Sequence, residues 1–246
     1  MTVMIVLFVV VAVLFSSIIR GIAGFGFAIV AVPVVSLVLP PLEAVALAVL
    51  MQLIVGFHDV RALRKDIHKP SLLRLALGSL VGTPIGIFAL AVMTPDAARI
   101  LISVSVMFGL LLLLRYKPTE PRPSGHLAAV TGVASGVFSG LAAMPGPPAV
   151  AYYLGVGMPA KETRASLLIF FFFSALIATP GLAVAGAIDL HMLFLVGLSV
   201  PGLIFGTWLG TEAFKRLGSD QYRTIAIGVM AVSAVISGWR GLAAYL

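Results

Sequence analysis

The sequence contains no cysteine among its 246 residues and very few charged residues. Without cysteine the chain can form neither disulfides nor iron–sulfur clusters, and it offers no thiolate chemistry. Its four histidines are scattered without an HxxxH pair, so the sequence predicts no metal, haem or other cofactor. Charged residues make up 10% of the chain, against about 25% in soluble domains. This scarcity of charge excludes an ordinary soluble fold.

Long uncharged runs stand where a soluble protein would have polar residues. Hydrophobic residues account for 61% of the chain, and the mean hydropathy is +1.15. Several runs are close to the roughly 20 residues that a membrane-spanning helix needs, and they lack the alternation of a transmembrane strand. The runs without Asp, Glu, Lys or Arg are 2–19, 21–42, 75–95, 100–114, 165–188 and 224–239. The sequence therefore predicts an all-α integral membrane protein.

The net charge of +7 does not indicate a nucleic-acid partner. The basic residues lie in short segments between the apolar runs, as the positive-inside rule describes for a protein whose partner is the lipid bilayer. There is no GxxxxGK[ST] or HExxH motif, and we find no acidic dyad or Ser–His pair at membrane depth. We therefore expect no enzyme, and any transport would have to run on a gradient.

Two halves of the sequence align with each other. With a shift of 124, residues 78–99 fall on 202–223; both segments contain GxxxGTxxG, and both place an acidic and a basic residue at the same offsets. With a shift of 119, Gly21, Pro40 and Glu43 fall on Gly140, Pro159 and Glu162. Such duplications are common in transporter folds.

The charges between the runs indicate that the second copy is inverted. Residues 61–74 carry five basic residues, whereas the equivalent segment near 184–192 carries no Lys or Arg. We expect two inverted repeats of about five helical segments each, 1–115 and 124–246, joined by a linker at 116–123. The expected cytoplasmic regions are 61–74, the linker, Lys161 with Arg164, and Lys215 with Arg216. Both termini would then lie outside the cell inner (cytoplasmic) membrane.

The first two segments of each repeat are expected to form a broken or hairpin pair. As one helix, the first 40 residues would be about 60 Å long, twice the hydrocarbon core. The chain must turn near 21–26 and, in the second half, near 139–148, where Pro and Gly dominate. The sequence leaves open whether each pair is two full spans or a re-entrant hairpin of half-helices.

The two breaks suggest a binding site for a small anion. Irregular backbone at membrane depth is tolerated only where protein or a water-filled cavity surrounds it. A broken helix also exposes amide hydrogens and a partial positive charge at its N-terminus. Two related breaks could therefore face one midplane site. The expected substrate-binding residues are Arg20, Gly21, Gly24, Gly26, Phe27, Gln52, Ser139, Gly140, Met144, Pro145, Gly146, Pro147 and Pro148.

Several of these side chains also have a structural interpretation. Arg20 could pair with an anionic substrate or anchor a cytoplasmic helix end. Gln52 could donate to a substrate oxygen or link two helices. For His58 and Asp59, a solvated cluster at a loop end is favoured over a proton relay. The run Phe170–173 is expected to serve packing and lipid contact.

Three glycine ladders at intervals of four residues indicate close helix packing. Packing within one protomer is the main interpretation, with a homodimer as the alternative. The ladders are Gly78–Gly82–Gly86, Gly132–Gly136–Gly140 and Gly202–Gly206–Gly210.

The stretches RGIAGFGFAIVAVP (20–33) and SGVFSGLAAMPGPPAVAYYLGVGMPAKETRASLLIFF (135–171) resemble the TauE/SafE family of sulfite exporter-like permeases. The resemblance covers the whole chain in layout, but only these two signatures in motif. It implies transport of small sulfur oxyanions or organosulfonates. The family's usual GGG or GGP core is replaced here by Gly26-Phe27-Ala28 and Pro145-Gly146-Pro147.

These observations predict a secondary transporter, an exporter of small anions such as sulfite or organosulfonates, that works by alternating access. The alternative is a passive channel or membrane subunit for a small neutral solute.

Overall fold

The computed structural model describes residues 3–115, 124–216 and 228, and the elements that it contains there are all helices. The helices are α1 Val3–Ala23, α2 Phe27–Val35, α3 Pro41–Leu63, α4 Lys69–Val92, α5 Pro95–Arg115, α6 Gly125–Ala142, α7 Gly146–Gly155, α8 Ala160–Val184 and α9 Leu190–Lys215. Six of them, α1, α3, α4, α6, α8 and α9, are long and apolar enough to cross a membrane. The prediction of an all-helical, multi-pass membrane protein is therefore confirmed. The expected segment at 224–239 lies outside the described residues, apart from residue 228.

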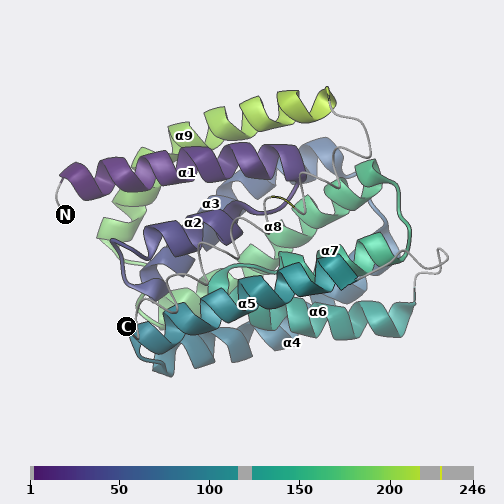
Figure 1. Ribbon diagram of the computed structural model, residues 1–246, viewed down its shortest axis with the longest axis horizontal. Coiled ribbons are helices and arrows are strands. Elements are labelled where there is room, and N and C mark those ends of the chain that lie inside the picture. The colour runs from purple at the N-terminus through teal and green to yellow at the C-terminus, as the bar shows by residue number, and fades with distance from the viewer. Residues whose placement is uncertain (1–2, 116–123, 217–227, 229–246) are drawn as a thin grey trace.

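Two short helices answer the question that the sequence left open about the broken pairs. Helix α2 has 9 residues and α7 has 10, so each is about 14–15 Å long and reaches only halfway through a hydrocarbon core of about 30 Å. Each follows a long helix and packs against it, α2 on α1 and α7 on α6 (Figure 1). In each half the second segment is therefore half-length and does not form a full span.

The glycine ladders join helices from different halves of the chain. Gly78, Gly82 and Gly86 on α4 face successive turns of α6 between Ala129 and Leu141. The order of contacts rises along both helices, so α4 and α6 run parallel. A Cβ atom on any of these glycines would overlap backbone atoms of α6. The expectation of close packing within one protomer is confirmed.

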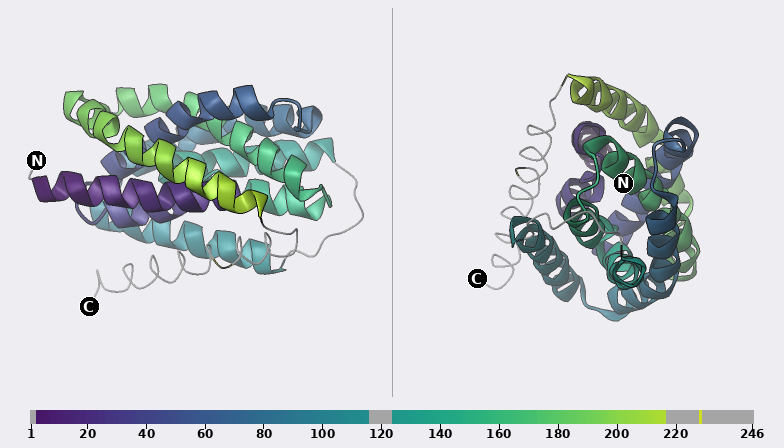
Figure 2. Two further views of the ribbon diagram at one scale, coloured as in Figure 1. Left: turned by 90° about the horizontal axis from the view of Figure 1, so that it is seen from above. Right: turned by 90° about the vertical axis from the view of Figure 1, so that its right-hand side faces the viewer.

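Helices α1 and α9 form a second pair of the same kind. They lie side by side in both views of the fold (Figures 1 and 2). Gly206 and Gly210 on α9 approach Leu14 and Ile18 in rising order, so these helices are also parallel. The first helix of each half thus packs on the fourth helix of the other, and α3 packs on α8 between them.

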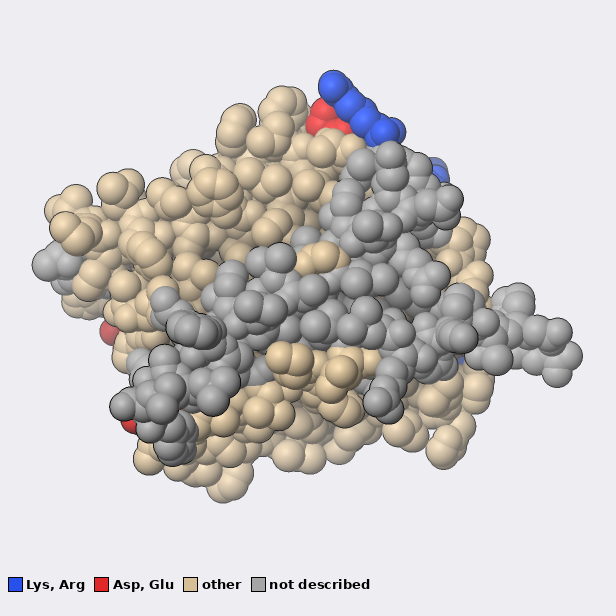
Figure 3. Space-filling view, viewed as in Figure 1, with Lys and Arg blue, Asp and Glu red and all other residues tan. Residues whose placement is uncertain are grey.

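The basic residues gather at one end of the bundle. Lys161 Nζ at the start of α8 donates to Asp66 Oδ1 after α3, at 3.0 Å. Arg164, one turn further, reaches the last turns of α9. The face in Figure 3 is nearly free of charge over its described part, and Lys and Arg appear beside the end of α9. We call this the basic end; it includes Arg61, Arg64, Lys65, Lys161 and Lys215.

Candidate functional site

A small cavity lies between the two helix breaks. Residues 25–29 line it from the first break and residues 143–146 from the second, with Arg20, Gln52 and Phe171 completing the wall. Its volume is about 10 Å³, which is room for about one water molecule. Segments more than 110 positions apart in the sequence therefore meet around one space.

The cavity lies at mid-depth in the bundle. Gln52 is close to the middle of α3 (Pro41–Leu63), and Phe171 is close to the middle of α8 (Ala160–Val184). Both helices are long enough to cross the membrane. This depth is where transporters built from two repeats place their substrates.

The first break depends on glycine. Gly24 and Gly26 have φ angles of 75° and 97°, in the left-handed region that other residues rarely adopt. Gly26 is the N-cap of α2 and offers no side chain to cap the helix. The first turn of a helix has no internal acceptor for its N–H groups, and no other described residue accepts from the amides of residues 27–29. These amides can therefore meet a ligand at the cavity.

The second break is held by Gln52. Its Nε2 donates to the carbonyl oxygen of Ala143 at 3.1 Å, and Ala143 has a φ of 54°. Helix α7 then begins at Gly146. Pro147 and Pro148 follow and carry no N–H, so the first turn of α7 offers fewer donors than that of α2. The two ends are similar in position but unequal in hydrogen-bonding capacity.

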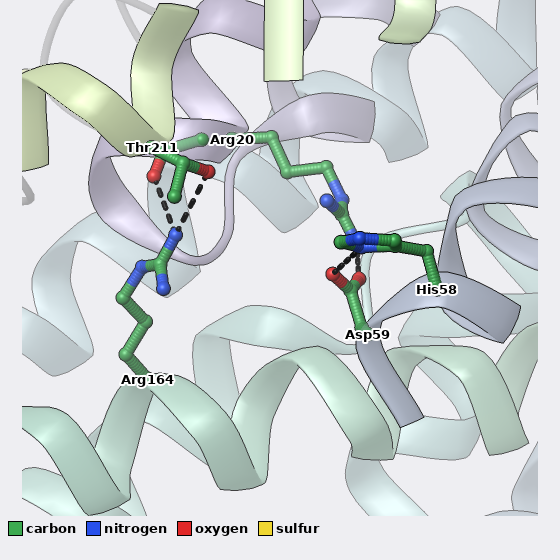
Figure 4. A network of polar contacts seen from close by, with 6 residues as sticks. Arg20, His58, Asp59, Arg164 and Thr211 are labelled. Carbon is green, nitrogen blue, oxygen red and sulfur yellow. Dashed lines mark hydrogen bonds and ion pairs between the residues drawn. The ribbon is translucent and has the colours of Figure 1, made fainter. Parts of the chain in front are cut away.

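Arg20 forms a buried ion pair beside the cavity. It is 2% exposed, and its Nη2 contacts Oδ2 of Asp59 on α3, whose side chain is 8% exposed (Figure 4). Its Nε is buried and has no hydrogen-bond partner among the described residues. His58 Nδ1 lies 3.9 Å from Asp59 Oδ1, and the His58 side chain is 80% exposed. The expectation of a solvated cluster holds for His58 but is wrong for Asp59, because a buried guanidinium requires a counter-charge.

Arg164 is a site residue that the sequence interpretation missed. It was expected to face the cytoplasm, yet it is only 8% exposed. Its Nη2 donates to the carbonyl oxygen of Gly21 at 2.7 Å and contacts Thr211 Oγ1 at 3.4 Å (Figure 4). Its guanidinium also lies 4.4 Å from the ring centroid of Phe214. Arg164 therefore holds the last turn of α1, next to the first break, against α8 and α9.

The expected binding residues fall into two groups. Those that line the cavity are Arg20, Gly26, Phe27, Gln52, Met144, Pro145 and Gly146. Those that do not are Gly21, Gly24, Ser139, Gly140, Pro147 and Pro148.

Some residues outside the cavity have packing roles. Gly21 packs against Gly210, and Gly140 packs against Gly86. Ser139 Oγ accepts a hydrogen bond from Ser174 Oγ at 2.9 Å. Phe171, expected to serve packing only, lines the cavity.

No group of three or more His, Asp or Glu side chains that could hold a metal ion occurs within residues 3–115 and 124–216.

Gly24→Ala is expected to destabilise the protein more than Gly186→Ala. Both glycines have nearly the same φ, 75° and 77°, so both substitutions pay the left-handed penalty of about 1–2 kcal/mol. At Gly186 nothing lies within 4 Å of the new Cβ, whereas at Gly24 it would lie 2.5 Å from Arg164 Cγ. Unfolding by denaturant in detergent would measure the difference. Equal losses of stability would show that Arg164 can move away from the new methyl group at no cost, and would contradict the prediction.

Comparison with known proteins gives a family match over most of the chain. The model of the family described as Sulfite exporter TauE/SafE matches residues 9–236. A curated relative from Cupriavidus necator, named as a probable sulfite/organosulfonate exporter TauE, is 25% identical over 217 residues, covering 86% of this chain and 85% of the relative. No solved structure gives a significant match. The chain therefore belongs to the sulfite exporter TauE/SafE family of membrane transporters.

Proposed function

We propose that this protein is a secondary transporter that exports small anions, such as sulfite or organosulfonates, and binds them in the cavity between the two helix breaks. The substrate class is the one in the name of the Cupriavidus necator relative. The observation that carries the proposal is the lining of the cavity. Both breaks and the buried Arg20 meet there, and Arg20 keeps a buried Nε without a hydrogen-bond partner among the described residues.

The electrostatics of the cavity favour an oxyanion. Helices α2 and α7 both begin at the cavity wall, and each helix N-terminus carries a partial positive charge. Free N–H groups and a planar guanidinium suit the oxygens of a sulfite or sulfonate group. Phe25, Phe27 and Phe171 add apolar wall that would face the carbon chain of an organosulfonate.

We further propose that residues 1–115 and 124–246 are inverted repeats that rock against each other to give alternating access, with 116–123 as their linker. Packing of α1 on α9 and of α4 on α6, parallel in both cases, supports this proposal because equivalent helices exchange partners between the halves. The cavity supports it too. At about 10 Å³ it is too small for a sulfite ion, so the halves must separate before substrate enters.

The proposed location is the cell inner (cytoplasmic) membrane, with the basic end in the cytoplasm. Lys and Arg are concentrated on the cytoplasmic side of membrane proteins. Helix α1 ends at the basic end, since Arg164 at the start of α8 bonds to Gly21. This orientation places the N-terminus outside, and the C-terminus would lie outside as well if the second half holds five segments.

Gly146→Ala is expected to weaken anion binding without unfolding the protein. The new methyl group would lie 3.4 Å from Phe171 Cζ, an ordinary contact, and would fill the cavity. An overpacking cost of about 1–3 kcal/mol against the bound anion would lower the affinity by about fivefold to 150-fold. Thermal shift of the purified protein with sulfite, sulfate, sulfoacetate, taurine and small carboxylates, at matched ionic strength, measures this effect.

The matched control for this experiment is Gly197→Ala. Gly197 is exposed on α9 and has nothing within 4 Å of a new Cβ, so this variant should bind like the wild type. Saturable stabilisation by an anion, weakened in Gly146→Ala and kept in Gly197→Ala, supports the site. If no anion stabilises the folded wild type, the proposal fails and the channel for a neutral solute takes its place.

A further inference from the structure

A group of mostly buried polar side chains lies between the cavity and the basic end. The hydroxyl oxygen of Tyr152 on α7 is 2.8 Å from Ser71 Oγ on α4, which is also 2.8 Å from Nδ1 of His68. The backbone N–H of His68 donates to Ser166 Oγ on α8 at 3.1 Å, and the hydroxyl of Tyr153 interacts with the same serine. We call His68, Ser71, Tyr152, Tyr153 and Ser166 the polar cluster. It ties α8 to both α4 and α7.

The depth of the polar cluster follows from the helices that carry it. Helix α7 begins at the cavity wall with Gly146, and Tyr152 follows six residues later, about 9 Å further along the helix. On α8, Ser166 precedes the cavity residue Phe171 by five residues, so it lies closer to the start of the helix at the basic end. His68 is the N-cap of α4. The polar cluster therefore closes the bundle on the side of the cavity that faces the basic end.

The opposite side of the cavity is closed by apolar residues at the matched positions. The two shifts that align the halves, 119 and 124, match every residue of the polar cluster with an apolar one. The matched residues, which we call the apolar cluster, are Pro33 for Tyr152, Val34 for Tyr153, Leu47 for Ser166, Met192 for His68 and Leu195 for Ser71.

The apolar cluster is packed as tightly as the polar one. Leu47, Met192 and Leu195 belong to the hydrophobic core and are 1%, 4% and 2% exposed. Leu47 precedes the cavity residue Gln52 by five residues on α3, and Leu195 lies in the second turn of α9, so both lie away from the basic end. Helix α3 packs on both α2 and α9, as α8 packs on both α7 and α4. The two closures are alike in architecture and differ in polarity.

This difference in polarity makes the two closures unequal in the cost of opening. Hydroxyl and imidazole groups that separate exchange their mutual hydrogen bonds for hydrogen bonds to water, at a small net cost. Apolar side chains that separate expose hydrocarbon to water and lose a free energy that grows with the exposed area. Opening at the basic end therefore costs less than opening at the opposite end.

Resting on the proposed function, we propose that the substrate-free transporter opens mainly at the basic end, through the polar cluster, and that the hydroxyl of Tyr152 is the latch that closes this gate. The apolar cluster keeps the opposite end shut in the substrate-free protein. In the proposed orientation the basic end is cytoplasmic, so the empty cavity is offered to the cytoplasm. This is the side from which an exporter has to load its anion.

The test uses cysteine labelling, because the chain has no cysteine of its own. Ser166→Cys places a thiol in the polar cluster, and Leu47→Cys places one at the matched buried position of the apolar cluster. Each full-length variant is purified in detergent without any substrate anion and treated with a cationic methanethiosulfonate reagent, which reacts where water enters. The exposed positions Lys65 and Thr94, one near each end, give reference rates as Lys65→Cys and Thr94→Cys. Relative to these references, we expect Ser166→Cys to react about tenfold or more faster than Leu47→Cys.

Tyr152→Phe tests the latch. It removes the hydrogen bond to Ser71, whose hydroxyl keeps His68 as a partner. Loss of one hydrogen bond should raise the labelling rate of Ser166→Cys about fivefold and leave the rate of Leu47→Cys unchanged. The matched control is Ser199→Ala, which removes a buried hydroxyl that bonds within α9, to the carbonyl oxygen of Leu195. It should change neither rate.

Several outcomes would overturn the gate. Equal relative rates for the two thiols, or a faster rate at Leu47→Cys, would show that the two ends do not differ in opening. If Tyr152→Phe leaves the rate at Ser166→Cys unchanged, or raises both rates equally, Tyr152 is only a structural residue. If Ser166→Cys does not fold, Ser71→Cys and Leu195→Cys make the same comparison at the next matched pair.

The thermal shift with anions separates this proposal from the proposed function. Anions that stabilise the protein, together with equal labelling at both ends, leave the transporter in place and remove the polar gate. Unequal labelling in a protein that no anion stabilises leaves the gate in place and removes the anion site.

Discussion

Replacing Arg20 with methionine is expected to destabilise the protein by about 3–5 kcal/mol, the usual cost of leaving one partner of a buried ion pair without its counter-charge. The carboxylate of Asp59 would remain, with a side chain only 8% exposed. The free energy of unfolding, measured by denaturant titration in detergent micelles, gives the loss. Asp59→Leu alone should cost a similar amount, because it strands the guanidinium.

The double variant Arg20→Met/Asp59→Leu distinguishes structure from function. A buried pair replaced by apolar groups of similar volume usually leaves stability unchanged or improved, so the double variant should recover most of the loss from either single change. It should still fail to bind any anion. Recovery of folding together with wild-type anion binding would show that Arg20 has only a structural role.

Gly82→Ala is expected to lower the free energy of unfolding more than a methyl group added on the surface or in a loop of the bundle. The new Cβ would overlap the carbonyl oxygen of Val133 and lie 2.9 Å from the amide nitrogen of Val137. Overpacking costs about 1–3 kcal/mol where side chains can adjust. Here the obstacle is the backbone of α6, which can yield only by moving the whole helix away from α4.

The matched control is again Gly197→Ala, which has nothing within 4 Å of the new Cβ and should raise the free energy of unfolding by up to about 1 kcal/mol through the higher helix propensity of alanine. Displacement of α6 should also reach the site, because the carbonyl oxygen of Ala143, just past the end of α6, accepts the hydrogen bond of Gln52. Gly82→Ala should therefore weaken anion binding as well. Similar stability for the two variants would contradict the tight α4–α6 contact.

Much of the fold was predictable because its signals are local. Uncharged runs predict helices, and proline with glycine predicts breaks at 21–26 and 139–148; the structure has these breaks at 24–26 and 143–145. The ladders predicted close packing, since only glycine allows a backbone to approach so near. The inverted arrangement of the two halves stays a prediction.

The site was less predictable because its contacts join segments far apart in the sequence. The pairing of Arg20 with Asp59 spans 39 positions, and the bond from Arg164 to Gly21 spans 143. Asp59 on α3 and Arg164 on α8 both lie near helix ends rich in basic residues, so the sequence alone favours their exposure to solvent. One signal was available in the sequence. Asp59 follows Gln52 by seven residues, or two helical turns, so both lie on the same face of α3.

The cross-packing of helices has a consequence for synthesis. Among the described helices α1 is made first, and its partner α9 is made last. At about 5–20 residues per second, about ten seconds or more pass before α9 is complete. During that time the face of α1 that will contact Gly206 and Gly210 lies against lipid. The contact between α1 and α9 therefore forms only after α1 has entered the membrane. Until α9 is made, α1 depends on the bilayer, or on an assisting factor, to hold its position.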